Sequence, residues 1–247
     1  MTKIKLQELL KAVNTYLKVH EFKDYGPNGL QVQGKEEIEK IVFSTSASLE
    51  VIEKAIECHA DALIVHHGIF WDKDSRVLEG PILKKVKALI ENNISLIAYH
   101  LPLDAHREVG NNFMTLKLLG ATHLEVFESI GSKGVVDVQS KQLISKISQL
   151  FDVNPMVPPY KDKTITKIAS VSGGGHSYIK ACVEEGIEAL ISGTFDEWVW
   201  DYAQENEILF IPIGHYKSEN IGIKALEIYV KQTWNIKTAY LEVSNPY

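Results

Sequence analysis

The sequence has little cysteine and no long apolar run. Only two cysteines, Cys58 and Cys182, occur in 247 residues, and neither belongs to a Cys-x-x-Cys pair. This pattern excludes a disulfide framework and a thiolate zinc finger. No stretch of about 18 consecutive apolar residues occurs, so we expect no transmembrane helix and no membrane partner. The sequence also lacks a Gly-x-Ser-x-Gly motif, and no Ser/His/Asp triad can be assembled from its spacing.

Positive charge is also scarce. The 26 lysines and arginines are outnumbered by 32 acidic residues, which gives a net charge of −6. This balance argues against a nucleic-acid partner, because nucleic-acid binders neutralise phosphates with an excess of basic residues. The segment Met1–Phe22 mixes apolar and charged side chains as an amphipathic helix does, and no secretory signal is visible. We therefore expect a globular protein of the cytoplasm.

Short apolar runs alternate with helical stretches along the first half of the chain. The runs Ile41–Phe43, Ala62–Val65 and Ile94–Ala98 predict buried strands. Between them, Leu49–Cys58 and Ile82–Asn92 show helical patterns. Strands that alternate with helices in this way predict an α/β fold with a largely parallel sheet.

The same order of elements returns in the second half, which indicates an internal duplication. One constant shift along the chain gives the matched pairs Ile41 and Ile168, Ile52 and Ile179, Asp61 and Glu188, and Ala62–Ile64 and Ala189–Ile191. We therefore predict two similar α/β domains, residues 1–128 and 129–247, with a boundary in the polar stretch Glu128–Gly134. The alternative that the C-terminal segment packs on the first domain stays open.

Histidines and carboxylates follow the predicted strands where these end. They are His66 and His67, His100 with Asp104 four residues later, and His215 with Glu219 four residues later. Ligand sites in open α/β sheets form at the carboxyl ends of the strands, so we expect these side chains to converge. Imidazole and carboxylate donors suit zinc, iron, manganese or nickel, and there are enough of them for two ions and a bridging water.

Simpler interpretations of the same residues remain open. Neighbouring residues of a strand point to opposite faces, so His66 and His67 can both reach one site only if the chain turns, which Gly68 would allow. His215 and Glu219 could equally be an ordinary pair four residues apart on a helix.

Three further segments each have two interpretations. Gly173–Gly175, between a strand and a helix, could bind phosphate or form only a tight turn. Phe70 and Trp71 could stack on a planar base or cap the core. In the turn after the first helix, Asn28 and Gln31 are either site residues or turn formers.

Taken together, these motifs resemble one known family, the GTP cyclohydrolase 1 type 2 homologues, also called the Ngg-interacting-factor-three-like proteins. The resemblance extends from Asp24 to Pro246. The motifs that carry it are Tyr25–Val32, Ala62–Gly68, His100–Asp104, Gly110–Asn112, Gly173–Gly175, and Gly214-His215 with Ser218-Glu219.

The resemblance implies two related domains that face each other across a metal-containing cleft, and a toroidal homohexamer. It also implies two divalent metal ions, whose ligands would be His66, His67, Asp104, His215 and Glu219. His100 would then lie beside the ligands and transfer protons.

The resemblance favours a hydrolase that acts on a nucleotide-type substrate through a metal-bridging water. A nucleotide phosphoesterase and a non-catalytic metal-binding or scaffold ring are the alternatives. One departure is visible: many members carry a carboxylate, often with a later histidine, where this chain has Ser192-Gly193-Thr194 and Trp198.

Overall fold

The computed structural model describes residues 3–245, which divide into two compact units. The first unit contains residues 3–103 and 223–244, and the second contains residues 104–222 and 245. Both are α/β units, as predicted. Within the described range, no helix combines the length and apolar character that a membrane crossing requires.

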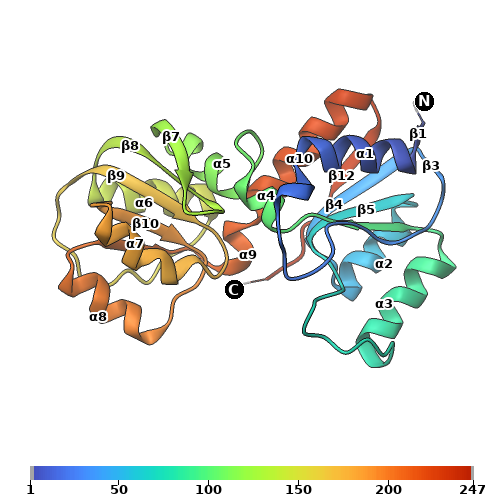
Figure 1. Cartoon of the computed structure of the whole chain (residues 1–247), viewed down its shortest axis with the longest axis horizontal. Coiled ribbons are helices and arrows are strands. Elements are labelled where there is room, and N and C mark those ends of the chain that lie inside the picture. Colours follow the sequence, from blue (N-terminus) through green and yellow to red (C-terminus); the bar gives the residue numbers. More distant parts are fainter. Residues whose placement is uncertain (1–2, 246–247) are drawn as a thin grey trace. The chain divides into compact units, whose positions relative to one another are not determined.

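The first unit is a five-stranded sheet in the order β12-β4-β5-β6-β2, in which only β2 runs antiparallel to its neighbour. Its strands are β2 (Gly29–Val32), β4 (Lys40–Ser46), β5 (Ala62–His67), β6 (Ser95–Ala98) and β12 (Lys237–Tyr240). Figure 1 shows α1 (Leu6–Tyr16) and α10 (Asn220–Trp234) on one face, and α2 (Leu49–Glu57) and α3 (Gly80–Glu91) on the other. Tyr16 of α1 stacks on Tyr229 of α10, with ring centroids 3.8 Å apart.

Three short elements complete this unit. They are β1 (Ile4–Lys5), which pairs with β3 (Glu37–Ile38), and the 3-10 turn η1 (Val19–Glu21). The helix predicted over Met1–Phe22 is therefore shorter than expected, and residues 1 and 2 lie outside the described range.

The second unit is a five-stranded sheet in the order β11-β10-β9-β8-β7. Its strands are β7 (Thr122–Phe127), β8 (Gly131–Gln139), β9 (Thr164–Val171), β10 (Ala189–Ser192) and β11 (Leu209–Pro212). Its helical elements are α5 (Asn111–Leu118), α6 (Ser140–Phe151), η2 (Gly175–Tyr178), α7 (Ile179–Glu184), α8 (Glu197–Glu205) and α9 (His215–Ser218). The short α4 (Leu101–Ala105) crosses the division between the units.

Helices cover both faces of the second sheet. Ile168 and Ile191 pack in a core with α5 and α6, whereas their neighbours Ala169 and Leu190 pack in a core with α7 and α8. A strand that buries both of its faces needs a continuous apolar run, which is why these strands could be recognised in the sequence.

The two sheets share a three-stranded parallel core with the same register. Ile41 of β4 lies opposite Ala62 of β5, and Ile168 of β9 lies opposite Ala189 of β10. The same shift along the chain therefore relates β4 to β9 and β5 to β10. The strand orders β4-β5-β6 and β9-β10-β11 also correspond. These matches fit the internal duplication that the sequence indicates.

A carboxylate directly before the second of these strands repeats as well. Asp61, directly before β5, accepts hydrogen bonds from the backbone N–H groups of Glu39 and Lys40. Glu188, directly before β10, accepts them from Thr166 and Lys167, the matching positions of the second unit. Each carboxylate therefore satisfies the backbone donors at the start of the adjacent strand.

The structure divides the chain elsewhere than at the predicted boundary of 128 and 129. Residues 104–128 belong to the second unit because β7 pairs with β8 in its sheet, so the expected linker Glu128–Gly134 is the turn between them and the start of β8. Asp104, which we assigned to the first domain, is therefore a residue of the second unit. Residues 223–244 return to the first unit because β12 pairs with β4, which is the alternative left open above.

Replacing Asp61 with asparagine is expected to lower the free energy of unfolding by about 1–3 kcal/mol near neutral pH, because hydrogen bonds to a charged acceptor are lost. Burial raises the pKa of Asp61, but the bonds from Lys35, Glu39 and Lys40 more than offset this and hold it below its usual value. The ionised form therefore stabilises the fold above the unfolded-state pKa of about 3.9, and this contribution disappears as the pH falls through the lower folded-state pKa.

Urea unfolding of wild type and Asp61→Asn, at neutral pH and at about pH 3, measures this effect. The difference between the two proteins should shrink at the lower pH. Asp137→Asn, at an exposed position of β8, is the matched control and should change stability by no more than about 0.5 kcal/mol. A difference that grows on acidification would contradict the assignment.

Candidate metal-binding residues

Three histidines cluster at the carboxyl end of the first unit's parallel strands. One ring nitrogen each from His66, His67 and His100 lies within 4.8 Å of the corresponding atoms of the other two. His66 is fully buried, and its ring centroid lies 4.6 Å from that of His67 and 5.1 Å from that of His100. The cluster could hold a metal ion, since imidazole nitrogen is the commonest metal ligand in proteins.

Two of these rings are oriented through their Nδ1 atoms by groups of the sheet. Nδ1 of His66 lies 2.9 Å from the carbonyl oxygen of Tyr99, to which it can only donate. Nδ1 of His67 lies 3.0 Å from the Ser46 hydroxyl. A ring held at Nδ1 presents Nε2 to a ligand, which is the usual arrangement of a metal-binding histidine.

His67 and His66 contribute to the same cluster although both are residues of β5. Successive Cβ atoms of a strand point to opposite faces, but the side chains also lean along the strand direction. Because β5 ends at His67, both rings can extend beyond the end of the strand. The chain leaves the strand at Gly68, the position where the sequence allowed a turn. A Cβ at Gly68 would lie 2.3 Å from the side chain of Gln31.

Asp24 is a site residue that the sequence interpretation missed. Its carboxylate lies 2.7 Å from Nδ1 of His100 and also accepts a hydrogen bond from the backbone N–H of Leu101. Burial raises the pKa of Asp24, but hydrogen bonds from His100, Asn28 and Tyr25 lower it to about 2. Asp24 is therefore ionised and fixes the orientation of the His100 ring.

The turn after the first helix holds the ends of the strands in place. Asn28 accepts a hydrogen bond from the backbone N–H of His100 and donates one to Asp24. Gln31 accepts one from the backbone N–H of Ile69, two residues beyond His67. Asn28 and Gln31 thus support the histidine cluster, although Gln31 is a residue of β2 and not of the predicted turn. The run of Asp, Asn and Gln side chains in Asp24–Gln31 is the sequence signal for this support.

The second unit contributes a buried carboxylate at Asp104. The side chain is 3% exposed, and one of its oxygens accepts hydrogen bonds of 2.8 Å from both Asn111 and the Ser172 hydroxyl. Asn111 in turn accepts a bond from the backbone of Gly222. One oxygen of the Asp104 carboxylate is therefore held in place by two neutral donors, and carboxylate oxygen is a ligand that divalent metals accept.

His215 and Glu219 form a pair in the same unit. Nε2 of His215 lies 3.2 Å from a carboxylate oxygen of Glu219, whose side chain is buried. A carboxylate oxygen of Glu219 also lies within 4.8 Å of one from Asp104. His215 and Glu219 flank Ser218, whose hydroxyl accepts a hydrogen bond from the backbone of Gly173.

Gly173 provides the space in which this pair sits. It has a φ of +56°, and a Cβ at this position would lie 2.2 Å from a Glu219 oxygen and 3.1 Å from Nε2 of His215. Gly173 therefore allows the backbone after β9 to approach the pair closely, which supports the turn interpretation of Gly173–Gly175.

The segment where this chain departs from the pattern of the family that it resembles packs beside Gly173. The backbone N–H of Thr194 donates to the carbonyl of Gly173, and the Thr194 hydroxyl lies 3.4 Å from Nδ1 of His176. His176 pairs with Asp196 at 3.2 Å and lies against the ring of Trp198. A histidine and a carboxylate are thus present here, although at other positions than the family pattern suggests.

The donor chemistry of both units fits a divalent transition metal. The first unit supplies imidazoles oriented through Nδ1, and the second supplies two buried carboxylates and an imidazole. The donors are nitrogen and oxygen without thiolate, as zinc, iron, manganese and nickel accept.

Comparison with known proteins gives a consistent result. A sequence model of the Duf34/NIF3 family (NGG1p interacting factor 3) matches residues 4–246. A protein of Chlamydia muridarum, named GTP cyclohydrolase 1 type 2 homolog, is 39% identical over 97% of this chain and 98% of its own. The solved structure of the protein ybgI, whose function is unknown, has a TM-score of 0.95, 34% identity, and covers 99% of this chain and 100% of its own. A structure from Thermus thermophilus has a TM-score of 0.92 and 29% identity, with 99% and 100% covered.

Proposed function

The chain belongs to the Duf34/NIF3 family, and from that premise we propose that it is a metal-dependent hydrolase of nucleotide-type substrates. The proposed ligands of two divalent ions are His66, His67, Asp104, His215 and Glu219. His100 is the proposed catalytic residue, which transfers protons.

The observation that carries this proposal is the orientation of the histidines in the first unit. His66 and His67 are held at Nδ1 by the Tyr99 carbonyl and the Ser46 hydroxyl, an arrangement that directs Nε2 toward a ligand. Buried carboxylates in the second unit, Asp104 and Glu219, supply negative charge to balance a cation. We assign both donor sets to the same two ions because of the resemblance to the family.

When bound, the divalent metal supplies a Lewis acid and lowers the pKa of a water molecule toward neutrality. His100 is suited to the accompanying proton transfer because Asp24 holds its Nδ1 and leaves Nε2 as the atom that gains or loses the proton. The ionised Asp24 carboxylate stabilises the imidazolium that forms when Nε2 accepts a proton, as the aspartate of a catalytic triad does for its histidine.

Two hydrolytic reactions use these groups differently. A cyclohydrolase adds water at C8 of a purine and then needs proton transfers to open the ring, for which a histidine base and acid is suited. A phosphoesterase directs the water to phosphorus instead. The name of the Chlamydia relative favours the first reaction, and its substrate class comes to this chain only as part of our proposal.

Metal loading followed by turnover measurements tests the proposal. The protein is stripped with a chelator, reconstituted separately with zinc, iron, manganese or nickel, and analysed for metal content. We expect two ions per chain. The loaded protein is then incubated with a panel of nucleotides, and ring opening is followed by ultraviolet absorbance and phosphate release by a colorimetric assay.

Each outcome separates the alternatives. Ring-opened product supports the cyclohydrolase, and released phosphate with intact purine supports the phosphoesterase. Full metal content without turnover of any nucleotide favours a scaffold, and no bound metal contradicts the proposal. The homohexamer stays a prediction of the resemblance, and light scattering on the purified protein measures it.

A further inference from the structure

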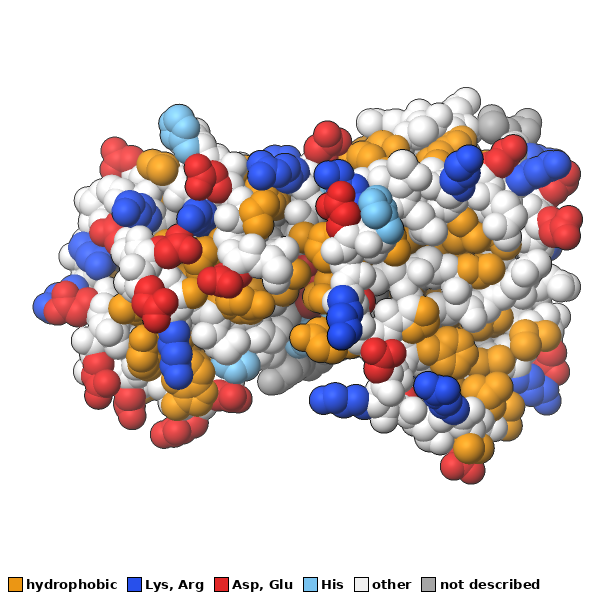
Figure 2. All heavy atoms as spheres, viewed as in Figure 1, with side chains coloured by type: hydrophobic (Ala, Val, Ile, Leu, Met, Phe, Trp, Pro, Cys, Tyr) orange, Lys and Arg blue, Asp and Glu red, His pale blue; other side chains and the backbone are white. Residues whose placement is uncertain are grey.

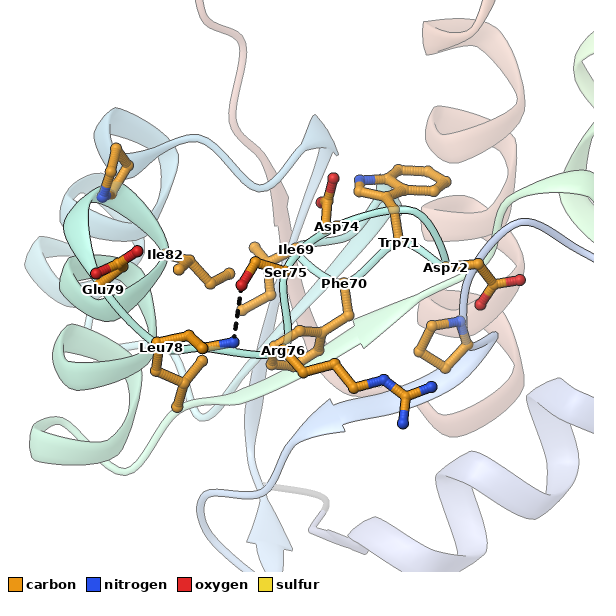
Figure 3. A pocket seen from close by; sticks show the side chains of 13 residues that line it. Ile69, Phe70, Trp71, Asp72, Asp74, Ser75, Arg76, Leu78, Glu79 and Ile82 are labelled. Atoms are coloured by element: carbon orange, nitrogen blue, oxygen red, sulfur yellow. Dashed lines mark hydrogen bonds between the residues drawn. The ribbon is translucent and has the colours of Figure 1, made fainter.

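The segment between β5 and α3 lines an open cavity of about 730 Å³ in the first unit. This volume is within the usual range of about 300–1,000 Å³ for small-molecule sites. Figure 3 shows that the lining side chains come mainly from residues 69–82, which begin two positions after His67. Figure 2 shows apolar side chains interspersed with charged ones on the part of the surface where Figure 1 places α2 and α3.

One wall of the cavity is shared with the histidine cluster. The ring centroid of Trp71 lies 5.1 Å from that of His100 in an edge-on arrangement, and 6.0 Å from that of His67. A flat group that stacks on Trp71 would therefore lie next to the cluster. Val77 and Leu78, which are 61% and 46% exposed, line the same cavity and offer apolar contact.

The charges of the lining are predominantly negative. Three acidic residues, Asp72, Asp74 and Glu79, line the cavity together with one basic residue, Arg76, so acidic side chains are in excess. Among residues 3–245, no ion pair involves any of these three carboxylates. These carboxylates would repel a phosphate group, whereas they would accept hydrogen bonds from the N–H donors of a neutral ring.

The side chains are placed so that stacking and hydrogen bonding can occur together. Figure 3 shows the Trp71 ring and the Asp74 carboxylate on one side of the segment, with the guanidinium of Arg76 on the other. The backbone N–H of Asp74 donates to the carbonyl of Trp71 at 3.0 Å, so both residues belong to one tight turn. This turn holds the backbones of the two residues close together, and both side chains line the cavity.

We propose that this cavity binds the uncharged, amino-substituted heterocyclic ring of a nucleoside-type substrate, by stacking on Trp71 and by N–H donors to Asp74, and that it does not bind the phosphates. This inference rests on the proposed function, because it names the part of the substrate that the site holds. Guanine carries two adjacent N–H donors that one carboxylate can accept, whereas hypoxanthine lacks the amino group.

Calorimetric titration of the metal-stripped protein with guanosine, inosine and GTP tests the inference without any turnover. Guanosine should bind roughly 10-fold more tightly than inosine, since a hydrogen bond to a charged acceptor is missing for inosine. GTP should bind no more tightly than guanosine. Trp71→Ala should weaken guanosine binding by about 10-fold or more, because stacking on an aromatic side chain is lost.

Two variants identify the contacts. Asp74→Asn should abolish the preference for guanosine over inosine, and Trp71→Phe should preserve most of the affinity. Ile90→Ala, an exposed position of α3 outside the cavity, is the control and should bind guanosine as wild type does. Circular dichroism of each variant confirms that it is folded.

Several results would overturn the inference. They are the absence of guanosine binding at millimolar concentration, an affinity unchanged in Trp71→Ala and Asp74→Asn, and tighter binding of GTP that is lost in Arg76→Ala. Guanosine binding without turnover after metal loading would leave this inference intact and contradict the proposed function. Turnover that Trp71→Ala does not alter would support the proposed function and contradict this inference.

Discussion

Replacing Glu219 with glutamine is expected to remove at least one metal ion per chain and to abolish most of the hydrolytic activity. Glu219 is buried and lies 3.2 Å from His215, so its carboxylate supplies negative charge where little solvent can replace it. Glutamine keeps the volume of the side chain but loses the charge. Elemental analysis and turnover, measured on the same preparation, give the result.

His100→Ala should behave differently. We expect turnover to fall by about 10²–10⁴-fold, the usual contribution of a general acid–base, while most of the metal is retained. Loss of a group beside the ligands can weaken metal binding by about 10–100-fold, so the assay needs excess metal. Asp24→Asn is the companion variant: it keeps the imidazole but removes the charged acceptor at Nδ1, and should lower turnover without reducing metal content.

The reverse result would reassign the residues. If His100→Ala empties the site while Glu219→Gln leaves it full, His100 is a ligand, which its distance to His66 and His67 allows. If both variants hydrolyse nucleotides as well as wild type does, the activity arises elsewhere and the scaffold alternative is favoured.

Gly173→Ala is expected to lower metal affinity by about 10-fold or more, although no ligand is changed. The new methyl group would lie 2.2 Å from a carboxylate oxygen of Glu219, so Glu219 must move away from its position beside His215. The positive φ adds a backbone cost of about 1–2 kcal/mol for any residue other than glycine. Competition with a chelator of known affinity measures the change.

The neighbouring residue provides a close control. A Cβ at Gly174 would meet no atom within 4 Å, and its φ of −77° suits alanine. Gly174→Ala should therefore bind metal as wild type does, with unchanged stability. Wild-type metal affinity in Gly173→Ala would show that the close approach of this glycine to Glu219 has no bearing on metal binding.

The sequence was sufficient for the parallel core of each unit. Strands such as β5 and β10 are buried on both faces, so they appear as continuous apolar runs, and the constant shift between the two halves is visible without a structure. The antiparallel strands β7 and β8 were missed because neither forms a continuous apolar run: β7 is mostly exposed, and the second half of β8 alternates between buried and exposed residues. Partners far apart in the chain, such as β12 and β4, leave no local pattern.

For the candidate site, the sequence by itself determined that the donors are imidazoles and carboxylates and that they follow apolar strands. Parallel strands of one sheet end at the same edge, so donors that follow them lie at that edge. Only the tertiary structure decided which atoms are presented. Asp24 reaches His100 from a distant part of the chain, and Ser46 reaches His67 from the neighbouring strand. The orientation of an imidazole depends on a hydrogen bond to one specific atom, and the partner that supplies it is brought near only when the strands pair and the turns close.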